Sequence, residues 1–440
     1  MRVYLHRLGC PKNDVDADYI AARLIHDGHT MTDDAAQGEA IIINTCGFIA
    51  SAREESVDAI LELAEYKRTG QARAVYVTGC LSQRYSGELL EELPEVDSVF
   101  GLGALDELAA AIGGKSARGA FLTDARNLRY LGYATRQISD DYPYAYLKIS
   151  DGCNRRCSYC AIPAIRGDYR SRTVDSLVNE ARFLAENGKR ELILVSQEAT
   201  LYGHDIGEKG GIEKLLRALD AVEGIEWIRL MYLHPAQLRE DLIDYLASND
   251  NKSVPYFDLP LQHINDRILA AMNRHVKRAQ IERLIDRIRK VTPSGTLRTT
   301  FIVGFPGETE TEFDELMKFV EQVEFDRLGA FVFCREEGTP AAAMEAQVSP
   351  KTAHDRLDQL MMLQQDIAVT ANNDLIGSTV NVIIDRLDTA DLGVGRTQGD
   401  CPDIDQEVFV LSGGLKVGQI VRVRIIDAEG YDLRGLKVED

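Results

Sequence analysis

Apolar runs of strand length alternate with longer stretches of helical periodicity over the first 112 residues. Each run is nearly continuous, as expected for parallel strands that are buried on both faces. The runs are VYLHRLG, IIINT and AVYVTG, and helices are predicted from about Asp14, Ser51 and Ser82, with the two serines as N-caps. The pattern predicts a parallel α/β domain, and we interpret the polar stretch from Gly113 to Asp141 as a linker.

A second alternation of strands and helices extends from Tyr144 to about Phe333. Six strand-like runs recur there, namely AYLKIS, ELILVSQ, WIRLMYL, YFDLPLQ, LRTTFIVGF and LGAFVF. Six successive βα units predict an incomplete TIM-like (βα)6 barrel, with functional residues at the carboxyl ends of its strands. Ser349 and Pro350 then begin a long predicted helix.

Short β runs replace the helical period beyond Gly377 and predict a small C-terminal β-barrel. The chain is therefore an α/β protein with three predicted domains, at residues 1–125, 139–370 and 375–440.

The composition is that of a soluble globular protein, with 45% hydrophobic and 27% charged residues. No apolar run reaches the roughly 18 residues that span a bilayer, and the N-terminus lacks the apolar core of a signal peptide. We expect a cytoplasmic protein with no membrane partner. Eight cysteines in such a chain favour metal binding or catalysis over disulfides, because cellular thiols keep cysteines reduced.

Three cysteines form a CxxxCxxC motif directly after the first strand of the predicted barrel. We call Cys153, Cys157 and Cys160 the loop triplet. Three thiolates at this spacing can bind a [4Fe-4S] cube and leave one iron open. An open iron at a barrel mouth can chelate S-adenosylmethionine (SAM), whose reductive cleavage gives a 5′-deoxyadenosyl radical. The alternative, a structural zinc site, would need a second cysteine pair that the sequence lacks.

Three further cysteines each end a strand-like run of the first region. We call Cys10, Cys46 and Cys80 the strand-end triplet. Their separations of 36 and 34 residues each match one βα unit, and the carboxyl ends of parallel strands meet at one edge of a sheet. The three thiols could therefore meet and bind a second [4Fe-4S] cluster, although three unrelated buried cysteines are the alternative. Cys334 and Cys401 have no sequence partners, and we interpret both as incidental.

Glycine and polar residues follow several of the predicted barrel strands. In FIVGFPGET the backbone turns tightly after the strand, so that a ligand could approach the main chain closely. The predicted SAM contacts are Tyr159, Gln197, Glu198, Gly304, Gly307 and Glu308. No catalytic residue beyond the cluster ligands is predicted. Arginines near the loop triplet could be solvated or could bind carboxylates or substrate; they are Arg155, Arg156, Arg166, Arg170 and Arg172.

Both triplets and the order of the three regions resemble the methylthiotransferases, a family of radical SAM enzymes, over essentially the full length. The resemblance implies an auxiliary [4Fe-4S] cluster on the strand-end triplet, a radical [4Fe-4S] cluster on the loop triplet, and a C-terminal TRAM barrel. It also implies that SAM is used twice, once to methylate sulfur and once to form the radical.

Several long strings resemble the RimO type of this family, which modifies an aspartyl residue of the small-subunit ribosomal protein S-twelve. They are LGCPKNDVDAD, SQEATLYGHD, DLPLQH, GAFVFCREEGTPA and GDCPDIDQEV. Residues 375–440 hold 7 Lys and Arg against 12 Asp and Glu, a net charge of −5 that suits a basic protein better than RNA. Direct tRNA binding is therefore not expected.

The predicted reaction replaces a C–H bond by a C–S bond at the β-carbon of that aspartate, with two SAM and a sulfur donor. We expect a low-potential electron donor such as a flavodoxin or ferredoxin. The alternatives are a tRNA adenosine methylthiotransferase, and an acidic ribosome-binding module that contains only a structural metal.

Overall fold

The N-terminal region is a six-stranded parallel sheet in the computed structural model, which describes residues 1–114, 118–128, 136–138, 140–248 and 250–438. Its strand order is β2-β1-β3-β4-β5-β6, and every pairing is parallel. The strands are β1 (Arg2–Arg7), β2 (Thr30–Thr32), β3 (Ala40–Thr45), β4 (Ala74–Gly79), β5 (Ser98–Phe100) and β6 (Gly119–Phe121). The helices are α1 (Pro11–His26), η1 (Ala35–Gln37), α2 (Ala50–Arg68), α3 (Cys80–Glu92) and α4 (Leu105–Ile112).

Strand β3 is buried on both faces of this sheet. Ala40 and Ile42 belong to a hydrophobic cluster with α1 and α4, whereas Ile41 and Ile43 pack with α2 and α3. Side chains alternate between the faces of a strand, so a continuous apolar run fills both layers. The predicted parallel α/β domain is confirmed.

The predicted linker from Gly113 to Asp141 is wrong in part. Strand β6 and the 3₁₀ turn η2 (Ala125–Asn127) lie within it, and Phe121 stacks on Phe100 with 5.1 Å between ring centroids. Three residues are too few to display a strand period, so the sequence pattern missed β6. The remainder of the predicted linker, the predicted boundary at residue 139 and the chain end at 440 fall wholly or partly outside the described residues.

The two predicted N-caps are also wrong. Helices α2 and α3 begin at Ala50 and Cys80, so Ser51 and Ser82 lie inside the first turns. Gly79, with a φ of 104°, turns the chain from β4 directly into α3 and leaves no loop in which a serine could cap the helix. Cys80 thereby becomes the first residue of a helix.

Six parallel strands form the central region in sequence order, as predicted. They make two sheets, β7-β10-β11 and β12-β13-β14, and a parallel bridge between Ile228 and Ser253 joins them. The strands are β7 (Tyr144–Lys148), β10 (Glu191–Val195), β11 (Trp227–Leu230), β12 (Tyr256–Gln262), β13 (Thr296–Val303) and β14 (Arg327–Val332). The surrounding helices are α6 (Val174–Glu186), α7 (Gly211–Asp220), α8 (Glu240–Ala247), α9 (Asp266–Ala271), α10 (Arg278–Val291) and α11 (Glu310–Val323).

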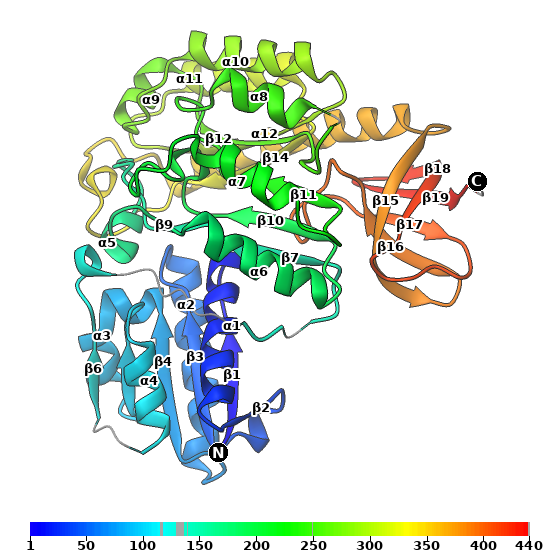
Figure 1. Ribbon diagram of the computed structural model, residues 1–440. Coiled ribbons are helices and arrows are strands. Elements are labelled where there is room, and N and C mark those ends of the chain that lie inside the picture. The colour runs from blue at the N-terminus through cyan, green and yellow to red at the C-terminus, as the bar shows by residue number, and fades with distance from the viewer. Residues whose placement is uncertain (115–117, 129–135, 139, 249, 439–440) are drawn as a thin grey trace.

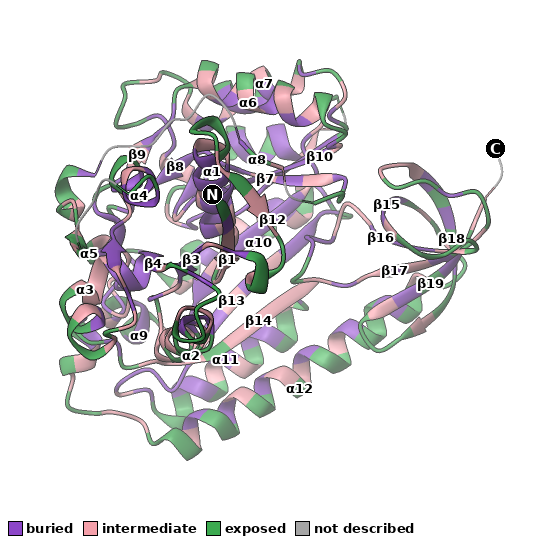
Figure 2. Ribbon diagram, turned by 90° about the horizontal axis from the view of Figure 1, so that it is seen from below, coloured by how far each residue is buried: buried purple, intermediate pink, exposed green. Residues whose placement is uncertain are grey.

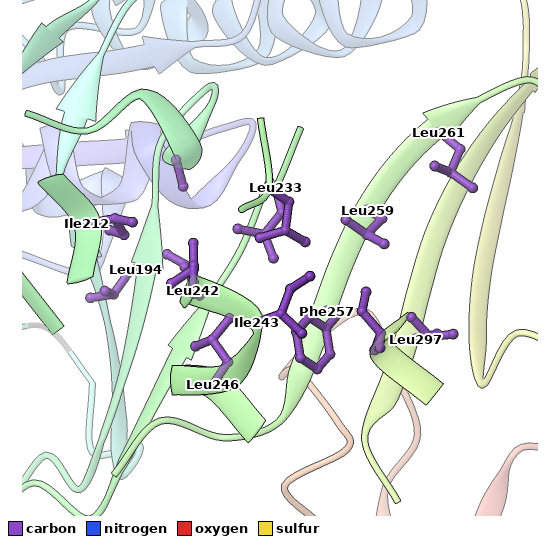
Figure 3. Packing of buried hydrophobic residues seen from close by; sticks show 14 of the residues in the cluster. Leu194, Ile212, Leu233, Leu242, Ile243, Leu246, Phe257, Leu259, Leu261 and Leu297 are labelled. Atoms are coloured by element: carbon purple, nitrogen blue, oxygen red, sulfur yellow. The ribbon is translucent and has the colours of Figure 1, made fainter. Parts of the chain in front are cut away.

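The largest hydrophobic core lies between these strands and their helices. Leu194 of β10, Ile212 of α7, Leu242 of α8 and Phe257 of β12 belong to this core (Figure 3). Burial of these side chains stabilises the barrel wall and leaves the strand ends for polar groups.

Short elements that the sequence pattern missed surround the loop triplet. Strands β8 (Ser150–Asp151) and β9 (Arg170–Ser171) pair antiparallel, and α5 (Ile162–Arg166) lies between them. Further 3₁₀ turns are η3 (Ala199–Leu201) and η4 (Pro340–Ala343). The β8–β9 pair closes the segment that contains all three cysteines.

The long helix α12 (Pro350–Asp374) leads from the central barrel to a closed five-stranded barrel of order β15-β16-β17-β19-β18. Figure 2 shows α12 with buried and exposed residues along its length. The strands are β15 (Thr379–Thr389), β16 (Leu392–Arg396), β17 (Val408–Leu411), β18 (Ile420–Glu429) and β19 (Asp432–Lys437). The predicted small barrel is confirmed. None of the helices described is both long and apolar enough to cross a membrane.

A loop between β16 and β17 fixes the C-terminal barrel to the central one. In this docking loop, residues 398–405, the Asp400 carboxylate accepts a hydrogen bond from Arg327 at 2.6 Å. Asp405 accepts one from the Tyr256 hydroxyl, also at 2.6 Å. Cys401, predicted to be incidental, is 2% exposed and packs in a cluster with Tyr256 and other barrel residues.

Candidate cofactor and substrate site

The strand-end triplet lies at the carboxyl ends of three neighbouring strands, β1, β3 and β4. Cys10 is the N-cap of α1, Cys46 directly follows β3, and Cys80 begins α3. In Figure 1 these strand ends face the central barrel. Burial raises the pKa of Cys80 to about 11, and the neighbouring thiols of Cys10 and Cys46 add to the shift. The three thiols are thus mutual neighbours, as the strand-end spacing predicts.

Each cysteine of this triplet is adjacent to a glycine that permits close backbone packing. A Cβ at Gly79 would stand 2.4 Å from the Thr45 carbonyl oxygen, and one at Gly47 would stand 2.7 Å from the Cα of Leu81. A Cβ at Gly9 would stand 3.3 Å from the Cys46 Sγ. A Gly-Cys or Cys-Gly pair at each strand end is therefore a sequence signal for this close packing. The pattern of apolar runs alone does not include it.

Asn13 and Arg166 connect this triplet to the central barrel. The Asn13 amide donates to the carbonyl oxygens of Leu8 and Thr45, at 3.1 and 3.0 Å. Its Oδ1 accepts from Arg166 at 2.5 Å and from the Cys80 thiol at 3.8 Å. Arg166 ends α5, just after the loop triplet, so the segment that carries this triplet contacts Asn13 beside the strand-end triplet.

The loop triplet is held by backbone hydrogen bonds and one arginine. The Cys153 N–H donates to the Gly167 carbonyl at 3.1 Å, and Arg274 donates to the Cys157 Sγ at 3.7 Å. Burial raises the pKa of Cys153 to about 11 and that of Cys160 to about 12. Such thiols stay protonated at neutral pH unless a metal stabilises the thiolates.

Both triplets have the donor chemistry of an iron-sulfur site. In the part of the chain that the structure describes, no three His, Cys, Asp or Glu side chains form a group that could hold a metal ion. A cube, in contrast, attaches each cysteine to a different iron and therefore spreads its sulfurs more widely than one ion does. The buried cations Arg166 and Arg274 complement the negative charge of thiolates. The residues at both triplets therefore fit a [4Fe-4S] cluster.

The predicted SAM contacts after β10 and in the loop triplet differ in whether they already contact other protein groups. Both polar side-chain atoms of Gln197 are buried without a hydrogen-bond partner among the described residues, as expected of a group that awaits a ligand. Glu198 instead pairs with Arg155 at 3.0 Å, and Tyr159 lies against Arg274 and Cys157.

The residues of the turn after β13 pack against, and form hydrogen bonds with, α12 and the segment that precedes it. A Cβ at Gly304 would stand 2.5 Å from that of Ala353, so this glycine permits the packing of α12. The Gly307 N–H donates to Ala346 at 2.6 Å, and Glu308 pairs with Arg356 at 2.8 Å. Contact of these residues with SAM stays a prediction.

The arginines near the loop triplet bind protein groups, which favours the carboxylate alternative. The ion pairs are Arg155–Glu198, Arg156–Asp168, Arg166–Asp151 and Arg172–Glu180, and Arg170 donates to the Asp168 carbonyl. These side chains organise the loop and are not a free substrate patch.

Sequence reasoning missed two buried polar residues at the strand ends. His234, after β11, has a buried Nε2 with no hydrogen-bond partner, and burial lowers its pKa to about 2. Lys12 of α1 extends to the barrel, where its Nζ lies 3.5 Å from the Ser196 carbonyl oxygen. Both are polar residues in a short loop or the first turn of a helix. The burial of such residues follows no strand or helix period, so the sequence pattern does not reveal it.

Comparison with known families accounts for all three regions. Family models match the radical SAM superfamily at residues 147–320, the uncharacterized protein family UPF0004 at residues 2–101, and the TRAM domain at residues 376–438. Among solved structures, the radical SAM methyltransferase TsrM from Kitasatospora setae is similar with a TM-score of 0.52 and 16% identity, over 77% of this chain and 76% of that one. This likeness shows the fold alone.

Curated relatives match over nearly the whole chain. The ribosomal protein uS12 methylthiotransferase RimO of Geobacter sulfurreducens is 44% identical and covers 99% of this chain and 98% of its own. The protein of the same name from Clostridioides difficile is 42% identical with the same coverage. At this identity and coverage, the chain belongs to the RimO family of radical SAM methylthiotransferases.

Proposed function

We propose that this chain attaches a methylthio group to the β-carbon of an aspartyl residue of ribosomal protein uS12, with two SAM and a sulfur donor. The observation that supports this most directly is the opposition of two thiol triplets, one at the ends of β1, β3 and β4 and one at the mouth of the central barrel. A single triplet would serve radical formation, whereas sulfur insertion also needs a site that presents sulfur.

The enzyme uses SAM and [4Fe-4S] clusters. We assign the radical cluster to the loop triplet and the auxiliary cluster to the strand-end triplet. When bound, the radical cluster would pass on the electron that cleaves SAM to a hydrogen-removing radical, and the auxiliary cluster would provide the site at which sulfur is presented.

The protein's own residues hold and shield these groups. Arg274 and Arg166 place buried positive charge beside the loop and strand-end triplets, and Asn13 fixes the loops after β1 and β3 relative to each other. The unpartnered polar atoms of Gln197 and His234 at the ends of β10 and β11 are suited to hydrogen-bond SAM. A low-potential donor such as flavodoxin or ferredoxin would supply the electron, and a ribosomal substrate implies a cytoplasmic reaction.

The names of the relatives favour uS12 over a tRNA adenosine as substrate. The net charge of residues 375–440 supports a basic partner less strongly than the sequence implies, because several acidic groups of the C-terminal barrel pair with internal arginines. Asp385 pairs with Arg396, and Asp400 pairs with Arg327. The negative charge of residues 375–440 is therefore only partly available to a basic partner, and the absence of tRNA binding remains a prediction.

The test is an assay with the purified, iron-loaded and reduced enzyme. Incubation with SAM, sulfide and uS12 should add one methylthio group in place of one hydrogen on an aspartate, as detected by tandem mass spectrometry. A parallel reaction with tRNA should leave its adenosines unchanged. Modification of the tRNA with uS12 untouched would refute the proposal.

A further inference from the structure

Lys12 is a buried cation whose position the fold does not explain. It is the second residue of α1, it is 8% exposed, and it follows Cys10 by two residues. Its Nζ lies 3.5 Å from the Ser196 carbonyl oxygen and 3.8 Å from the centroid of the Tyr232 ring. A residue of the N-terminal region therefore places its ammonium group on the barrel.

Two physical effects oppose a lysine at this position. A buried ammonium loses its hydration, and a cation in the first turn of a helix opposes the positive end of the helix dipole. The guanidinium of Arg166 is a further cation near Lys12. A carboxylate would offset all of these costs.

Comparison with the other buried lysines shows that such a carboxylate is missing. Of the lysines that are buried within the described ranges, Lys148 pairs with Asp16 and Asp151, and Lys189 pairs with Asp140. Lys12 has no carboxylate within 4.0 Å among the described residues, and its polar partners there are the Ser196 carbonyl and the Tyr232 side chain. An ammonium group donates three hydrogen bonds, so one donor remains for a ligand.

The location of Lys12 identifies the kind of ligand. Ser196 directly follows strand β10 and Tyr232 is the second residue after β11, at the barrel edge where ligands bind, and Cys10 belongs to the strand-end triplet. The ammonium thus lies between the two places where hydrogen removal and sulfur addition are proposed to occur.

We infer that Lys12 binds the side-chain carboxylate of the substrate aspartyl residue. This inference rests on the proposed function and adds the group that selects aspartate. The reacting β-carbon bears the carboxylate directly, so a cation that holds the carboxylate also fixes the carbon relative to both triplets. Asparagine has the same shape without the charge and forms the weaker, neutral interaction.

The experiment compares two peptides of the uS12 loop, one with the natural aspartate and one with asparagine in its place. Wild-type enzyme should bind the aspartate peptide more tightly and should lose roughly 100-fold in kcat/KM with asparagine, as is typical when one partner of a buried charge pair is removed. Lys12→Met should bind and modify both peptides equally poorly. Without peptide, Lys12→Met should still form 5′-deoxyadenosine from SAM.

Lys189→Met is the matched control, because it removes a buried lysine that lies before β10, at the end of that strand opposite to Ser196. It should retain the wild-type preference for aspartate. Recovery of that preference in Lys12→Arg would further support a role for the charge.

Two outcomes with the Lys12→Met variant would overturn the inference. Lys12→Met could keep the preference for aspartate, or it could lose cleavage of SAM, which would assign the lysine to SAM instead. If Lys12→Met fails to retain iron, the test uses the affinities of wild-type enzyme for the two peptides. Equal affinities of wild-type enzyme for the aspartate and asparagine peptides would then overturn the inference. Failure of wild-type enzyme to modify the aspartate peptide would instead contradict the proposed function.

Discussion

The two cysteine triplets are built in different ways. The loop triplet lies within eight consecutive residues, from Cys153 to Cys160, and local backbone hydrogen bonds hold it. The strand-end triplet is gathered from three strands over 71 residues, from Cys10 to Cys80, and depends on the register of a sheet. The strand-end triplet should therefore be more sensitive than the loop triplet to packing changes that leave its cysteines in place.

The largest expected effect separates the chemical roles of the triplets. Cys153→Ala should abolish cleavage of SAM and retain one cube of iron per chain. Cys46→Ala should also retain one cube but should continue to form 5′-deoxyadenosine, with no methylthio product. Iron analysis and product chromatography measure both variants, and two cubes in Cys46→Ala would contradict the assignment of the strand-end triplet.

Arg166 should make the strand-end triplet depend on the barrel. Arg166→Met removes the guanidinium that contacts Asp151 and Asn13 and leaves Asp151 with its longer contacts to Lys148 and Arg170. It should lower the free energy of unfolding by about 3 kcal/mol. Loss of a positive charge should also shift the reduction potential of the auxiliary cluster to more negative values, as measured by redox titration with electron paramagnetic resonance. Arg166→Lys keeps the charge and should restore much of the potential, whereas an unchanged potential in Arg166→Met would contradict this role.

Gly79 tests whether sheet packing controls the strand-end triplet. Gly79→Ala would place a Cβ 2.4 Å from the Thr45 carbonyl oxygen at a φ of 104°, and should cost about 3 kcal/mol in denaturant unfolding. Iron should be lost from the strand-end triplet before the loop triplet. The matched control is Gly87→Ala in α3, the helix that Gly79 precedes. The new Cβ there would meet no atom of the described residues within 4 Å and should stabilise the helix by roughly 0.5–1 kcal/mol.

The smallest expected effect concerns the backbone of Cys46. The Ser56 hydroxyl accepts from the Cys46 N–H at 3.1 Å and donates to its carbonyl at 2.9 Å. Ser56→Ala should lower the free energy of unfolding by about 1 kcal/mol, while the iron content changes little. A full loss of iron from the strand-end triplet in this variant would contradict this prediction. It would mean that iron binding depends on these two hydrogen bonds and not mainly on the sheet.

The sequence predicted what depends on regular periods and on residue identity. Strand β3 begins with four consecutive apolar residues, so both its burial and the place of Cys46 followed from the pattern. Strand β6 was missed because three residues display no period. The role of Lys12 was missed because its neighbours Ser196 and Tyr232 are more than 180 residues away along the chain. The charge of the C-terminal barrel was overvalued, because the pairing of Asp400 with Arg327 is likewise a long-range contact.

The docking loop has a consequence for exchange of the C-terminal barrel between related enzymes. Its Asp400 and Asp405 neutralise Arg327 and Arg298 of the central barrel, and Arg396 neutralises the buried Glu191. A chimaera that brings a foreign barrel without these groups would leave Arg327 without its carboxylate partner. It would also leave Arg298 and Glu191 with one partner each, Asp258 and Arg229. Grafts should therefore include the docking loop and Arg396 from the host, so the unit that evolution or design can exchange is smaller than the whole β-barrel.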